Sequence, residues 1–151
     1  MSFTLSIENQ PMKILLAVDG SSYTKRMLAY LAAHDEWLGA NHEYTVLHSV
    51  AAVPGRAAAV IDRDALKSYY DDANEAVFKP IRTFFKKQGI SADYVGKVGH
   101  APEIIAKMAD AQKFDLLVMG SHGHSTLGTL VMGSVTTKVL AHCKTPVLLI
   151  R

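Results

Sequence analysis

Short apolar runs alternate with amphipathic stretches along this chain, and that alternation restricts the fold more than any other feature of the sequence. Most of the runs stay apolar throughout instead of alternating with polar residues, which is typical of strands in a parallel sheet covered on both faces. The predicted strands are KILLAV (13–18), EYTVLHSV (43–50), SADYVGKV (91–98), FDLLVM (114–119) and PVLLI (146–150).

Between the runs, apolar residues recur every three or four positions, as in helices with one buried face. Helices are predicted from Ser21-Ser22 to about Leu38, from Asp62 to about Gln88, from Ala101 onward, and from Gly133 to about His142. Residues 51–61 favour a loop or a short helix. Strands that alternate with helices indicate the α/β class, here a doubly wound, five-stranded parallel sheet in a three-layer α/β/α arrangement.

The length of 151 residues suits a single domain over 1–151, with residues 1–11 expected as a loose N-terminal extension. The net charge of +2 comes from scattered basic residues without a basic stripe, so no nucleic-acid partner is expected. No run approaches the ~18 apolar residues of a membrane span, and no signal peptide is evident. With the single Cys143, these features predict a cytoplasmic protein without a membrane partner.

A glycine-rich stretch, GSHGHSTLGTLVMGS (120–134), follows the fourth predicted strand. Glycine clusters suit places where backbone must come close to something. In doubly wound sheets ligands bind beyond the carboxyl ends of strands, where both Asp19 and Gly120 are predicted to lie. Asp19 suits either ligand contact or a cap for the first helix. Gly133-Ser134 opens the last helix and offers free amides and a hydroxyl to a phosphate.

Several nucleotide and hydrolase motifs are missing from the chain. The glycine stretch lacks the lysine of a P-loop, and no G-x-G-x-x-G follows the first strand. No G-x-S-x-G nucleophile elbow is present either. His122 and His124 flank Gly123, but no third ligand is evident, so no metal site is expected from the protein alone.

The segment DLLVMGSHGHSTLGTLVMGSVTTKVL (115–140) resembles the universal stress protein family, whose nucleotide-binding members carry G-x2-G-x9-G-[S/T]. Gly120, Gly123, Gly133 and Ser134 fill that pattern. KILLAVDGSS, TVLHSV, VGHAPEII and TPVLLI are similar to other family segments in the same order. The resemblance implies an adenine nucleotide alpha hydrolase-like fold with strand order 3-2-1-4-5.

The resemblance also implies an adenine nucleotide as ligand, ATP or else ADP or AMP, with or without Mg²⁺. Asp19 would contact the adenosine end of the nucleotide, the second predicted strand would pass the adenine, and the start of the last helix would hold the phosphates. The implied binding residues are Val18, Asp19, Ser49, Met119, Gly120, His122, Gly123, Gly133, Ser134, Val135 and Thr136. A homodimer through antiparallel pairing of the last strand, Pro146 to Ile150, is implied as well, since that strand otherwise leaves an open edge.

One position departs from the family pattern. Many relatives have arginine, serine and glycine after the second motif glycine, where this chain reads His124-Ser125-Thr126. Loss of a fixed positive charge predicts weaker or pH-dependent triphosphate binding, and makes a smaller ligand such as AMP more plausible.

The expected function is therefore a dimeric, nucleotide-binding stress-response protein with no catalytic residues and weak ATP hydrolysis at most. Two alternatives stay open: an ATPase or nucleotidyl-transfer enzyme on the same fold, and a dimeric interaction module that binds no nucleotide.

Overall fold

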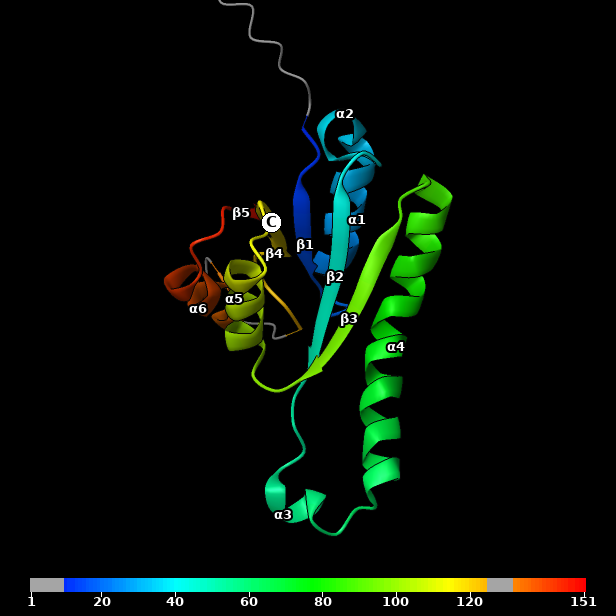
Figure 1. Ribbon diagram of the computed structural model, residues 1–151, viewed down its shortest axis with the longest axis vertical. Coiled ribbons are helices and arrows are strands. Elements are labelled where there is room, and N and C mark those ends of the chain that lie inside the picture. The colour runs from blue at the N-terminus through cyan, green and yellow to red at the C-terminus, as the bar shows by residue number, and fades with distance from the viewer. Residues whose placement is uncertain (1–9, 125–131) are drawn as a thin grey trace, which may run out of the picture.

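The computed structural model describes residues 10–124 and 132–151 of the chain, which form a single five-stranded sheet with helices on both faces (Figure 1). Residues 1–9 of the predicted extension and residues 125–131 of the glycine stretch lie outside the described residues. Every strand pairs in parallel, in the order β3-β2-β1-β4-β5, which confirms the predicted α/β class and strand order. The strands are β1 Lys13–Ala17, β2 Glu43–Val50, β3 Ala92–Val98, β4 Leu116–Gly120 and β5 Val147–Ile150.

The helices begin and end close to the predicted positions, with one exception. They are α1 Ser22–Ala33, α2 Asp35–Leu38, α3 Gly55–Ala58, α4 Arg63–Gln88, α5 Ala101–Ala111 and α6 Ser134–His142. The single helix expected up to Leu38 is wrong, because His34 leaves the helical conformation and separates α1 from α2. As the C-cap of α1, His34 donates to the Tyr30 carbonyl both from its amide, at 3.1 Å, and from the ring Nδ1, at 2.9 Å.

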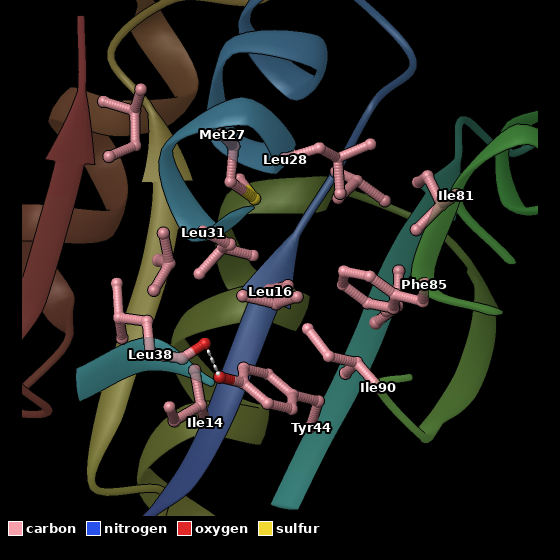
Figure 2. Close-up of a cluster of buried hydrophobic side chains, with 14 of the residues drawn as sticks. Ile14, Leu16, Met27, Leu28, Leu31, Leu38, Tyr44, Ile81, Phe85 and Ile90 are labelled. Carbon is pink, nitrogen blue, oxygen red and sulfur yellow. Dashed lines mark hydrogen bonds between the residues drawn. The ribbon is translucent and has the colours of Figure 1, made fainter. Parts of the chain in front are cut away.

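Two apolar clusters lie on opposite faces of the sheet, because successive strand residues point to opposite sides. On β1, Ile14 and Leu16 face α1 and α4, whereas Leu15 and Ala17 face α5 and α6. Figure 2 shows part of the first cluster, in which the Tyr44 hydroxyl donates to the Leu38 carbonyl at 2.5 Å. Burial of this hydroxyl raises the pKa of Tyr44 to about 12.

The strand order brings one end of the sheet into position for ligand binding. β1 pairs with β2 on one side and with β4 on the other, so the chain winds in opposite directions from β1. Ligands bind outside the carboxyl ends of strands at such a switch point. The β1–α1 turn and the residues after β4 meet there. Among the described residues, every helix is too short or too polar to span a lipid bilayer.

Candidate functional site

A pocket of about 270 Å³ opens at the carboxyl ends of β1, β2 and β4. The N-terminal turns of α1, α5 and α6 complete its wall. All of the residues predicted from the sequence as nucleotide contacts line it: Val18, Asp19, Ser49, Met119, Gly120, His122, Gly123, Gly133, Ser134, Val135 and Thr136. Sequence reasoning assigned no site role to a further group of lining residues: Ala17, Tyr23, Thr24, Leu47, His48, Ala101 and Ile105.

Asp19 presents one carboxylate oxygen to the pocket while the other is held by the turn into α1. Its Oδ1 accepts hydrogen bonds from the Ser21 amide at 2.9 Å and from the Thr24 hydroxyl at 3.1 Å. The helix cap is Ser21, whose hydroxyl accepts from the Tyr23 amide, so Asp19 does not cap α1. The turn therefore fixes the carboxylate and leaves Oδ2 turned toward Gly123.

Thr24 is the residue that orients this turn, and it is almost fully buried. Its hydroxyl oxygen accepts hydrogen bonds from the amides of Asp19 and Gly20, each at 3.2 Å. The same hydroxyl donates a hydrogen bond to Asp19 Oδ1. The sequence signal that could have revealed this positioning role is a threonine five residues after Asp19, in the first turn of the predicted helix.

The motif glycines are required by the close approach of two protein segments. A β-carbon at Gly123 would lie 2.6 Å from Asp19 Oδ2, and one at Gly120 would lie 2.6 Å from the β-carbon of Tyr23. At Gly133 it would meet the His122 backbone at 3.2 Å. None of the three has a positive φ, so contact distance explains the glycines here.

The N-terminus of α6 supplies hydrogen-bond donors to the same pocket. Gly133 is the N-cap residue, and its amide donates to the Ser121 carbonyl at 2.8 Å. The amides of Ser134, Val135 and Thr136 open the helix, where backbone donors have no intrahelical partner. With the helix dipole, this arrangement favours an anion.

Thr136 has less to offer a ligand than the sequence alone suggested. Its side chain is buried, and its hydroxyl donates to the Gly120 carbonyl at 2.9 Å. That bond ties the start of α6 to the end of β4. Ser134, by contrast, keeps its side chain exposed at the pocket.

The wall toward β2 and α5 is more apolar. Met119, Leu47 and Ile105 line it and belong to the apolar cluster that faces α5 and α6. Val18 also lines the pocket and is buried, but it belongs to the cluster on the other face of the sheet. The Ser49 hydroxyl donates to the Gly99 carbonyl at 3.1 Å, so its oxygen can offer a ligand only an acceptor. Such a surface suits a flat, partly apolar group.

Three histidines line the pocket, and the structure fixes each of them. His124 donates from Nε2 to the Asp19 carbonyl at 2.7 Å and so connects the residues after β4 to the β1–α1 turn. His122 contacts the Ser121 hydroxyl through Nδ1 at 2.9 Å, and His48 contacts Asn74 at 2.8 Å. Among the described lining residues, Asp19 carries the one permanent charge, and lysine and arginine are absent.

The described residues contain no group of three or more His, Cys, Asp or Glu side chains that could hold a metal ion. Asp19, the carboxylate at the pocket, is committed through Oδ1 to the α1 turn. The donor set of amides, one free carboxylate oxygen and an apolar wall suits a ribose, a flat base and a phosphate better than a cation. A divalent ion here would depend on oxygens that the ligand brings.

Comparison with protein-family models matches residues 11–151 to the universal stress protein family. A universal stress protein of Thermus aquaticus, from the 3′ region of QAH/OAS sulfhydrylase, is 33% identical over 139 residues, covering 91% of this chain and 97% of that protein. Both matches extend over nearly the whole chain.

Solved structures share the fold at lower identity. The protein MJ0577 of Methanocaldococcus jannaschii superimposes with a TM-score of 0.73 at 23% identity, over 93% of this chain and 96% of that one. A universal stress protein in complex with cAMP gives 0.66 at 20% identity, over 94% and 99% of the two chains. An Arabidopsis thaliana family protein with AMP bound gives 0.65 at 16% identity, over 93% and 91%.

Proposed function

This chain belongs to the universal stress protein family, and from that premise we propose that it is a cytoplasmic stress-response protein that binds ATP and acts as a homodimer. The observation that carries the proposal is one pocket that joins the free Asp19 Oδ2 to the open N-terminus of α6. The two groups suit opposite ends of a nucleotide.

The pocket chemistry supports an adenine nucleotide part by part. Ribose hydroxyls donate hydrogen bonds, and Asp19 Oδ2 is an acceptor held in place for them. The apolar wall with Met119, Leu47 and Ile105 suits the face of an adenine base. The amides of Ser134 and Val135 suit phosphate oxygens. Family members of the same fold hold cAMP and AMP, which supports the same class of ligand for this chain.

We propose binding with weak hydrolysis at most. Phosphoryl transfer is catalysed largely by positioning and by positive charge on the transferred group. The described lining offers one carboxylate, whose Oδ1 is already bonded, and no lysine or arginine. Mg²⁺ in this proposal enters with the phosphates, in keeping with the lack of a metal-ligating group among the described residues.

The homodimer is proposed to form through β5. This strand pairs with β4 on one side and lies at the edge of the sheet. Val147, Leu148 and Leu149 are half-buried, so the strand presents apolar side chains and unpaired backbone groups together. A second copy paired antiparallel would cover that edge.

The test is to measure binding of ATP, ADP and AMP by calorimetry, with Asp19→Asn as the site variant and Asp93→Asn, on the exposed part of β3, as its matched control. The proposal predicts binding by the parent and the control and a weaker affinity in the site variant. Nucleotide released on denaturation identifies the ligand carried from the cell. Failure of the parent to bind any of the three would favour the interaction module, and rapid ATP turnover would favour the enzyme.

A further inference from the structure

A second pocket, of about 450 Å³, adjoins the first. The two share Ser49, Ala101, Ser134 and Val135, so a molecule seated in the first pocket can extend into the second without leaving the protein surface. The second pocket lies beyond the carboxyl ends of β2 and β3, against the first turns of α5 and α6, two helices that pack side by side (Figure 1).

Lys138 gives the second pocket the fixed positive charge that the described lining of the first one lacks. It follows Ser134 by four residues on α6, so the two side chains share one face of the helix, and both are exposed. That face lines the second pocket. The Ser134 hydroxyl therefore lies at the open amides of α6, and the positive charge of Lys138 lies one helical turn further along the helix.

The other walls offer little that competes for Lys138. Ala51, Ala52 and Pro102 contribute small apolar surfaces. His100 also lines the pocket, and its Nδ1 lies 3.5 Å from a carboxylate oxygen of Glu103, so the nearby acid faces a histidine. Glu103 itself is absent from the described lining.

We propose that the second pocket is the subsite for the distal phosphates of a nucleoside di- or triphosphate, and that Lys138 determines the preference for these over a monophosphate. The inference rests on the proposed function. A phosphate at the Ser134 amide lies at the junction of the two pockets, and the next phosphate along the chain enters the second one. Lysine is a point charge on a flexible stem, which suits a phosphate chain that needs no bidentate contact.

Lys138 also compensates for the lack of lysine and arginine in the described lining of the first pocket. His124 also lines the first pocket, and its Nε2 donates to the Asp19 carbonyl. A triphosphate bound only in the first pocket would meet Asp19 and no permanent cation among the described lining residues. Lys138 supplies that cation from the second pocket.

The experiment measures dissociation constants for ATP, ADP and AMP with the parent protein, Lys138→Gln and Lys107→Gln. Lys107 is an exposed lysine of α5 outside both pockets and serves as the matched control. We expect Lys138→Gln to weaken ATP and ADP roughly three- to tenfold, as for loss of one exposed charge-assisted contact, and to leave AMP unchanged. Lys138→Arg should retain most of the ATP affinity.

The outcomes separate this inference from the proposed function. Suppose that the parent binds AMP and ATP, and that Lys138→Gln either weakens both affinities equally or changes neither. The second pocket is then not a phosphate subsite, although the first pocket still binds nucleotide. If the parent binds no nucleotide, both proposals fall together. Melting temperatures of all variants, expected to match the parent because both lysines are exposed, show that folding does not cause the change.

Discussion

Gly123 faces the carboxylate of Asp19 so closely that a β-carbon at position 123 would lie 2.6 Å from Oδ2. The two residues are far apart in the chain and meet where the β1–α1 turn approaches the segment after β4. Asp19 cannot easily turn aside, because its other oxygen accepts from the Ser21 amide and the Thr24 hydroxyl. The glycine therefore protects the orientation of the one acid in the described lining.

Replacing Gly123 with alanine should displace the Asp19 carboxylate and weaken nucleotide binding about tenfold, as expected when a charged hydrogen bond is lost. The free energy of unfolding should fall by about 1 kcal/mol, since the contact can relax by moving one side chain. Calorimetry and thermal unfolding measure the two effects.

Gly55→Ala is the matched control, because a β-carbon there meets nothing within 4 Å. Equal nucleotide affinity in Gly123→Ala and the parent would contradict the role assigned to Asp19.

Much of the fold could be predicted because its determinants are local. Apolar runs gave the strands, and the ends of α4 followed from the Asp62 cap and from Gly89, which has the left-handed φ of 68°. The break at His34 could not be predicted, because no glycine or proline marks it. The contacts of the His34 ring, which stacks on Tyr30 at 4.0 Å and donates to its carbonyl, are seen only in the structure.

The pocket could be predicted in part, for a related reason. Residues on motif segments, such as Asp19 and Gly133, were found by their pattern, and the structure brings them together. Ala101 and Ile105 lie in the segment VGHAPEII, to which sequence reasoning gave no site role, and they reach the pocket because α5 packs over β2. The sequence does not distinguish Lys138 from the other lysines of the chain, because only the position of the second pocket does so.

Asp110 gives a prediction about stability in acid. The amide of Lys144 and the hydroxyl and amide of Thr145 donate to its carboxylate and hold its pKa below the ordinary value of 3.8. A lowered pKa in the folded state stabilises the fold above the ordinary value, and this contribution is lost as the pH falls through the folded value. Asp110→Asn should melt below the parent at pH 7, with a difference that shrinks below about pH 4.

Thermal melts of the parent, Asp110→Asn and the exposed control Asp93→Asn check this, over a pH range from well below the ordinary aspartate pKa of 3.8 up to neutrality. A melting difference that stays constant over this range would show that the carboxylate charge is not what ties the end of α6 to α5.

The last prediction concerns the edge of the sheet. The Leu117 amide donates to the Pro146 carbonyl and the Ser121 amide to the Ile150 carbonyl, each at 2.8 Å. Even-numbered residues of β5 therefore pair with β4, and the backbone groups of Val147 and Leu149 point to the open edge.

Leu149→Pro removes one edge donor without removing a bond to β4, so it should convert the proposed dimer into a monomer that keeps its secondary structure. Leu149→Val keeps the amide and should stay dimeric. Sedimentation equilibrium gives the mass of each protein, and circular dichroism reports whether the fold persists. A monomeric parent, or a Leu149→Pro variant that folds and still dimerises, would show that β5 is not the interface, because antiparallel pairing needs the Leu149 amide as a donor.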